Sequence, residues 1–134
     1  MKITMDNESL ITMLDFYFSE IKFNNNKRTT ETTKINCQNR VEYHFDETDK
    51  TLVTVKINTE LNSDNNSINL SVSAVGVFSI PLELEARDYI CKANTVAIMF
   101  PFVRSEITLL TAQPGLMPIM LPPVDVNALM KDQK

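Results

Sequence analysis

The sequence of 134 residues is poor in the residues on which most active sites depend. Its two glycines, Gly76 and Gly115, are too far apart to form the glycine-rich loop that binds nucleotide phosphates. It has one histidine, His44, and two cysteines, Cys37 and Cys91, in separate segments. A metal site needs several such ligands close together, so we predict no metal and no cofactor. We also predict that the protein is not an enzyme.

The charge balance and the lack of long apolar runs exclude two further classes. The net charge is −4, whereas a nucleic-acid partner would require a basic face, so we predict no such partner. No run of about 20 apolar residues is present, so we expect no membrane insertion. Residues 1–8 are polar and acidic where a signal peptide is apolar. We therefore expect a cytoplasmic protein in which both cysteines are free thiols.

Strict alternation of apolar and polar residues predicts β-strands in the first 80 residues. Short polar turns near 46–50 and 62–66 separate three clear segments. Alternation of this kind gives a sheet one apolar face, which another element must cover. The apolar faces are formed by Ile35, Cys37, Val41, Tyr43 and Phe45, by Val53, Val55, Ile57 and Leu61, and by Ile68, Leu70, Val72, Ala74, Phe78 and Ile80.

An earlier segment also alternates, but its apolar residues change parity. Phe16 and Phe18 lie on one parity, and Ile21 and Phe23 lie on the other. This change predicts either a β-bulge or a strand that uses both faces. With the three later segments, it predicts an antiparallel meander of four strands.

The apolar period changes to three and four residues between 83 and 113, which is typical of a helix. Val103, Ile107 and Leu110 would form its buried stripe. Pro101 would either begin a helix at its first turn or kink one. A short second helix is predicted from 125 through 130, with Asp125 as its cap.

Strands followed by helices are typical of the α+β class, so we predict one α+β domain over residues 1–134. Its ends, about 1–8 and 131–134, are expected to fray. The segment between the two helices, 116–124, contains three prolines and should be extended. Four of the seven methionines lie at 99, 117, 120 and 130. Methionine is frequent on surfaces that bind many partners, but it also fills gaps in cores.

Two parts of the sequence resemble the SecB family of bacterial export chaperones. Residues 75–80, Val-Gly-Val-Phe-Ser-Ile, are similar to the Gly-Gly-Ile-Phe-Ser-Ile that ends the fourth strand in that family. Residues 100–106, Phe-Pro-Phe-Val-Arg-Ser-Glu, resemble its Phe-Pro-Tyr-Ala-Arg-Glu segment. The prolines of 114–123 and Asn-Ala-Leu at 127–129 then follow in the family's order. The resemblance extends from about residue 16 to 130.

The resemblance implies a four-stranded antiparallel sheet with a crossover segment, a long helix and a short C-terminal lid helix. Two protomers would pair, and two pairs would join through the long helices into a homotetramer. It implies an ATP-independent holdase that binds unfolded or partly folded polypeptides in hydrophobic grooves, for protein export or for protecting the antitoxin of a toxin–antitoxin module. The alternative is a structural or adaptor protein that uses the same fold to bind one folded partner.

The resemblance also assigns residues by position. The tetramer helix would carry Val103, Ile107 and Leu110. In the export chaperones, acidic residues and a leucine dock the SecA motor, and Glu20 matches one of the acidic positions. Asn24, Asn69 and Ser71 stand at the other three positions, so motor docking would depend on Glu20. The client-binding groove would be lined by Val41, Tyr43, Phe45, Phe78, Ile80, Leu121, Leu129 and Met130.

Overall fold

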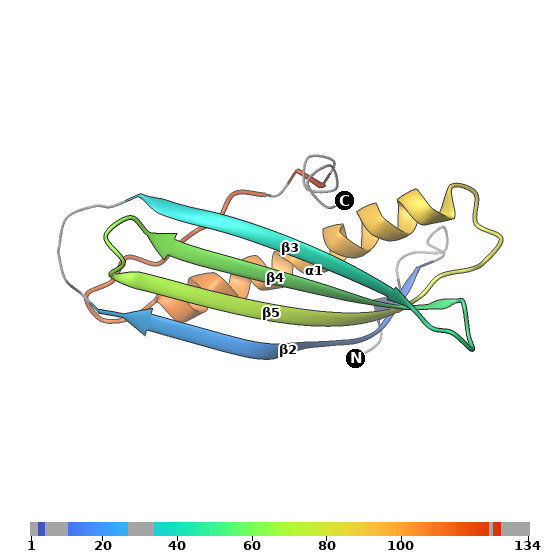
Figure 1. Ribbon diagram of the computed structural model, residues 1–134, viewed down its shortest axis with the longest axis horizontal. Coiled ribbons are helices and arrows are strands. Elements are labelled where there is room, and N and C mark those ends of the chain that lie inside the picture. The colour runs from blue at the N-terminus through green and yellow to red at the C-terminus, as the bar shows by residue number, and fades with distance from the viewer. Residues whose placement is uncertain (1–2, 5–10, 27–33, 124, 127–134) are drawn as a thin grey trace.

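The protein folds as an antiparallel sheet with one long helix packed across one face (Figure 1). The computed structural model describes residues 3–4, 11–26, 34–123 and 125–126. The predicted α+β class is confirmed. The elements are β1 (Ile3–Thr4), β2 (Thr12–Asn25), β3 (Ile35–Phe45), β4 (Leu52–Ser63), β5 (Ile68–Ser79) and α1 (Arg87–Thr111).

The order of the strands in the sheet is β1-β2-β5-β4-β3, and all neighbours are antiparallel. β3, β4 and β5 follow one another through short turns, as predicted. β2 pairs with β5 rather than with β3, so the four long strands have the Greek-key order and not that of a meander. Alternation indicates which face of a strand is buried but says nothing about which strand lies beside it.

Polar side chains hold the two tight turns of the sheet. The Asp46 carboxylate accepts hydrogen bonds from the backbone N–H groups of Thr48 and Asp49, at 3.1 and 2.8 Å, and from the Thr48 hydroxyl. These bonds lower the pKa of Asp46. At the other end, the Asn65 side chain accepts from the Ser67 N–H at 3.0 Å, and Asn66 has a φ of 58°, which asparagine tolerates.

A β-bulge resolves the change of parity in β2. The register shifts between Phe18 and Glu20, which leaves Ser19 as the extra residue. As a result Phe18 lies opposite Ala74, Ile21 opposite Val72 and Phe23 opposite Leu70, all on one face. The predicted bulge is therefore confirmed, and it keeps the aromatic residues of this strand on the side that α1 covers.

α1 crosses the apolar face of the sheet and closes the core. Cys91, Val96, Met99, Val103 and Ile107 are fully buried. They pack in one cluster with residues of every long strand, whereas the helix residues on the opposite side are exposed. Burial of apolar surface in this contact favours folding by about 25 cal/mol per Å².

The helix begins four residues later than the sequence predicted. Residues 82–86 form turns, and Ala86 has a φ of 54°. That left-handed conformation cannot continue a helix backward, so α1 begins at Arg87. Pro101 lies inside α1 and does not start it. It removes one helical hydrogen bond to Ala97, and both residues are exposed, so water can reach the freed carbonyl.

Residues 112–123, which we call the strap, follow α1; they turn at 114–115 and then continue to 123 without helix or strand. Of the predicted lid helix, only Asp125 and Val126 belong to the described residues, and Leu129 and Met130 lie outside them. No helix within the described ranges is both long and apolar enough to cross a membrane.

Candidate functional site

Two neighbouring aromatic residues of β3 face the first turns of α1. Tyr43 and Phe45 are half-buried at the edge of the sheet, two residues apart on the same face. The Tyr43 hydroxyl donates a 3.0 Å hydrogen bond to the Lys92 carbonyl. The Lys92 ammonium lies 5.8 Å from the Tyr43 ring centroid, and the Arg87 guanidinium carbon lies 5.4 Å from that of Phe45. Each ring therefore combines an apolar edge with a cation over its face.

Arg87 fixes the geometry at this end of the site. Its Nε donates to the Pro81 carbonyl at 2.9 Å, and Nη2 donates to the carbonyls of Lys50 and Ile80, at 2.6 and 3.3 Å. One side chain thus ties together the end of β5, the crossover segment 80–86 and the β3–β4 turn. This role could not be predicted, because the partners of Arg87 are backbone carbonyl groups of separate segments, which leave no pattern in the side chains.

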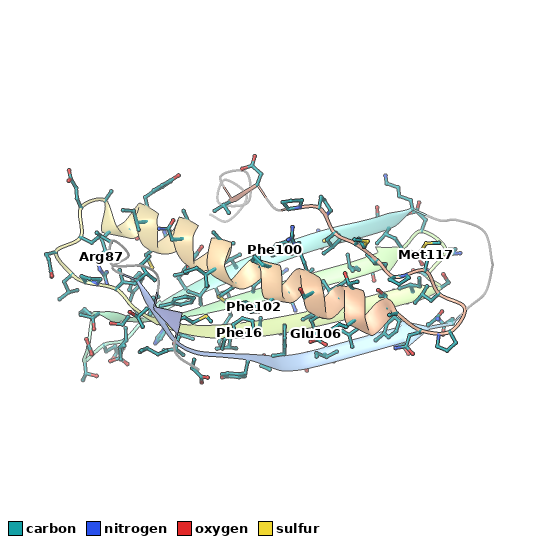
Figure 2. The ribbon with its side chains drawn as sticks, turned by 180° about the vertical axis from the view of Figure 1, so that it is seen from behind. Phe16, Arg87, Phe100, Phe102, Glu106 and Met117 are labelled. Carbon is teal, nitrogen blue, oxygen red and sulfur yellow. The ribbon has the colours of Figure 1, made fainter. Side chains whose placement is uncertain are left out.

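The strap lies against the last turns of α1 and is held there at Ile119. The Thr108 hydroxyl donates to the Ile119 carbonyl, and the Ile119 N–H donates to the Thr111 hydroxyl, both at 2.8 Å. The Ile119 and Leu121 side chains pack against the core. Met117 and Met120, on either side of Ile119, are each 82% exposed (Figure 2 labels Met117). The strap therefore presents methionines outward from a fixed point.

The structure separates the predicted groove residues into two groups. Tyr43, Phe45 and Leu121 are half-buried and reach the surface, and Val41 is 7% exposed. Phe78 and Ile80 have no exposed surface, because α1 and the crossover cover the end of β5. In this conformation those two residues belong to the core and do not form an open wall. Leu129 and Met130 lie outside the described residues.

The predicted oligomer residues of α1 lie mostly on its inner side. Val103 and Ile107 are fully buried against the sheet of their own protomer, and Leu110 is partly buried. The outward side of the helix instead exposes Phe102 and Leu109. Phe102 packs 5.1 Å from the Phe16 ring of β2, measured between centroids (Figure 2). The predicted burial of Val103 and Ile107 is confirmed. The spacing of apolar residues along the helix does not reveal which of its sides a second protomer could reach.

The four positions that correspond to motor docking gather on the outer face of the sheet. Asn24 lies directly opposite Asn69, and Glu20 and Ser71 lie on the same two strands. Glu20 is exposed and forms a 3.7 Å ion pair with Lys22. Its charge is therefore paired, and the other three positions carry amide or hydroxyl side chains.

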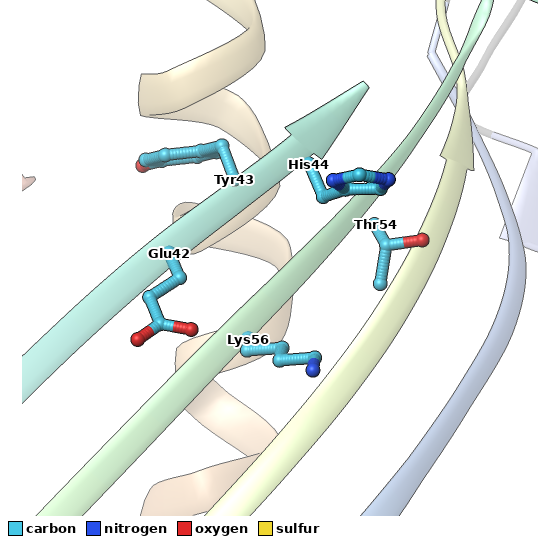
Figure 3. A pocket seen from close by; sticks show the side chains of 5 residues that line it. All are labelled: Glu42, Tyr43, His44, Thr54 and Lys56. Carbon is cyan, nitrogen blue, oxygen red and sulfur yellow. The ribbon is translucent and has the colours of Figure 1, made fainter. Parts of the chain in front are cut away.

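A shallow hollow of about 610 Å³ also lies on this side, near the end of β3 (Figure 3). Glu42, His44, Thr54 and Lys56 line it together with Tyr43, and α1 passes behind the sheet. His44 is exposed, as predicted. Within the described part of the chain, no three metal-binding side chains lie close enough together to hold an ion.

Burial changes the acidity of three groups near β3. Desolvation raises the pKa of Cys37, although its side chain is exposed on the edge strand, and burial raises the pKa of Cys91 to about 11. Both cysteines are free, as predicted, and a raised pKa keeps a thiol protonated and unreactive. Burial, assisted by the neighbouring Cys91 and Asp88, raises the pKa of Tyr43 to about 12.

The raised pKa of Tyr43 leads to a pH-dependent prediction. The folded-state pKa is about 12 and the ordinary value is 10.0, so the unfolded tyrosine ionises first. The protonated Tyr43 therefore stabilises the folded state fully below pH 10, and this stabilisation is lost as the pH rises from 10 toward 12. Tyr43→Phe should remove this fall in the free energy of unfolding, at a cost near neutral pH of about 1 kcal/mol for the lost hydrogen bond. Urea denaturation of both proteins at several pH values between 10 and 12 measures the free energy of unfolding. An equal fall in the variant would contradict the assignment.

The comparisons with known proteins agree with this architecture. The sequence model of the family described as preprotein translocase subunit SecB matches residues 6–134. The protein-export protein SecB of Azoarcus is 33% identical over 86 residues, which cover 61% of this chain and 55% of that protein. An uncharacterised protein of Methanocaldococcus jannaschii is 30% identical over 99 residues, or 72% of this chain and 64% of that protein. The chain thus spans less than two thirds of either relative.

A solved structure has the same fold. It is the Mycobacterium tuberculosis SecB-like chaperone Rv1957 in complex with a ChAD peptide from the HigA1 antitoxin. The TM-score is 0.70 at 12% identity, and the match covers 86% of this chain and 88% of that one. The protein belongs to the SecB family.

Proposed function

We propose that the protein is a cytoplasmic, ATP-independent holdase that binds unfolded or partly folded polypeptides. The observation that carries the proposal is the pair of half-buried aromatic residues, Tyr43 and Phe45, on the edge strand β3. Apolar side chains of a client gain about 25 cal/mol per Å² when they are buried there. Membership of the SecB family and the antitoxin peptide bound by the mycobacterial relative support this role.

The clients we propose are preproteins or an antitoxin. Export of preproteins by the family involves docking of the SecA motor, so the outer face of the sheet, where the docking positions lie, is relevant to this choice. Three of the four docking positions lack the residue type of the export chaperones, and Lys22 pairs with the remaining acid, Glu20. We therefore assign no SecA-docking role to this surface. The client-binding side of the sheet retains its apolar residues, so polypeptide binding does not depend on the motor.

The groove is tested by a Phe45→Asp variant. A charge at this half-buried position should weaken binding of an unfolded client by about tenfold or more, because the apolar contact is lost and a carboxylate is desolvated. His44→Asp is the matched control, since it lies next along β3 but on the opposite, exposed face. Suppression of aggregation of several unrelated unfolded proteins measures the effect. Equal activity of both variants would remove Phe45 from the site, and an inactive unmodified protein would reject the holdase proposal.

We further propose that four protomers assemble as a dimer of dimers. Among the described residues, β1 pairs only with Thr12 and Met13, so most of the outer edge of β2 carries no strand. Leu14 and Ile21 are exposed along it, as are Phe102 and Leu109 on α1. An unpaired apolar edge and an apolar helix face are typical of association surfaces. Light scattering of the purified protein should give the mass of four chains, and a single-chain mass would contradict the assembly.

A further inference from the structure

Two methionines of the strap have an exposure that packing does not explain. Met117 and Met120 are each 82% exposed, whereas Met13 and Met99 are 1% and 0% exposed. Methionine is an apolar residue that proteins use on surfaces binding varied partners. The described part of the chain therefore contains two accessible thioethers three residues apart and two buried ones that serve as internal references.

The position of this pair is fixed by the backbone between them. Both polar backbone groups of Ile119 are bonded to α1, through the Thr108 and Thr111 hydroxyls at 2.8 Å. The Ile119 side chain packs inward against the core. Met117 and Met120 consequently stay on the surface of the strap, close to the half-buried Leu121.

We propose that Met117 and Met120 form an oxidation site through which hydrogen peroxide weakens the binding of apolar polypeptide segments. The sulfur lone pair attacks one oxygen of the peroxide, the O–O bond breaks, and an S–O bond forms. The sulfur is oxidised to the sulfoxide and the peroxide is reduced to water. The apolar side chain becomes polar, so it no longer favours contact with an apolar client. This inference rests on the proposed holdase function, because it concerns the binding of the same apolar clients.

The first measurement locates the modification and does not depend on any client. The full-length protein is treated with hydrogen peroxide, and digested peptides are analysed by mass spectrometry over time. Peptides that contain Met117 and Met120 should gain oxygen before those that contain Met13 or Met99, since accessible sulfur reacts first. Simultaneous oxidation of all four, or protection of the strap, would overturn the proposal.

The second measurement connects the modification to binding. Affinity for a reduced and alkylated, permanently unfolded protein should fall about tenfold after oxidation, which corresponds to the loss of about one side-chain contact. Methionine sulfoxide reductases of both stereospecificities should restore it. Circular dichroism before and after treatment should show an unchanged fold.

Variants separate the strap from the other methionines. Met117→Leu with Met120→Leu keeps apolar area and removes the sulfur, so peroxide should no longer change the affinity of this protein, whatever that affinity is before treatment. Met117→Gln with Met120→Gln should bind weakly without treatment. Continued sensitivity of the leucine variant would overturn the proposal. If the untreated protein binds no client, the holdase function fails, and with it the regulatory role, while the peptide map still reports which sulfurs react.

Discussion

Replacement of Val103 by aspartate is expected to unfold the protein. Val103 is fully buried on the side of α1 that faces the sheet, in the cluster that joins the helix to all four long strands. An aspartate there would carry an unpaired carboxyl group into an apolar region. We expect a loss of about 4 kcal/mol or more, which is comparable with the whole stability of a small domain. Thermal unfolding followed by circular dichroism should show no cooperative transition at ordinary temperatures.

Leu109→Asp is the matched control for this substitution. Leu109 lies on the same helix but is 67% exposed. The variant should keep its free energy of unfolding to within about 0.5 kcal/mol as a protomer, since surface changes usually cost little. If the outward face of α1 joins the proposed dimers, this variant should have a lower mass by light scattering. A stable Val103→Asp protein would contradict the packing, and an unchanged mass for Leu109→Asp would exclude this helix face as the interface.

The second large effect is expected at Gly76, in the middle of β5. A Cβ atom at this position would lie 2.8 Å from Cε1 of Phe78 and 2.9 Å from Sδ of Met99. These distances are shorter than carbon and sulfur atoms allow, so Gly76→Val must displace both side chains from a closely packed core. We expect a loss of about 2 kcal/mol, measured by urea denaturation.

A double-mutant cycle tests whether the clash with Met99 is what makes Gly76→Val destabilising. Met99→Ala alone should cost about 2–5 kcal/mol, because it leaves a cavity under α1. Together with Gly76→Val, it should cost at least about 1 kcal/mol less than the sum, since the valine fills the space that the methionine left. Strict additivity would indicate that the glycine is required for another reason.

Much of the fold was predictable because each strand and the helix carry their own period. The apolar parity of β3, β4 and β5 indicated the buried face, and the parity change in β2 indicated the bulge. The pairing of β2 with β5 could not be predicted in the same way. It depends on contacts between distant segments, such as Phe16 opposite Gly76, and these leave no local pattern.

The candidate site was predicted only in part, for a related reason. Tyr43 and Phe45 were proposed as site residues because the aromatic parity of one strand and the family resemblance agree, and the structure places both half-buried on the edge strand. Phe78 and Ile80 lie on the same apolar face, but α1 and the crossover cover them, and a strand pattern does not show which part of an apolar face remains open. Arg87 was missed because its partners are carbonyl oxygens of three separate positions.

One of the two residues of β2 that have no partner on β5, Ser19, has a consequence for the comparison of sequences within this family. Because Ser19 is not matched on β5, Glu20 lies opposite Ser73 on the outer face, while Phe18 and Ile21 both point inward. In a relative without this extra residue, the residue at the same distance from the start of the strand as Glu20 would lie on the inner face. Alignments of this strand should therefore allow a gap of one residue at position 19. Without it, an acidic residue could be matched to a position on the wrong side of the sheet.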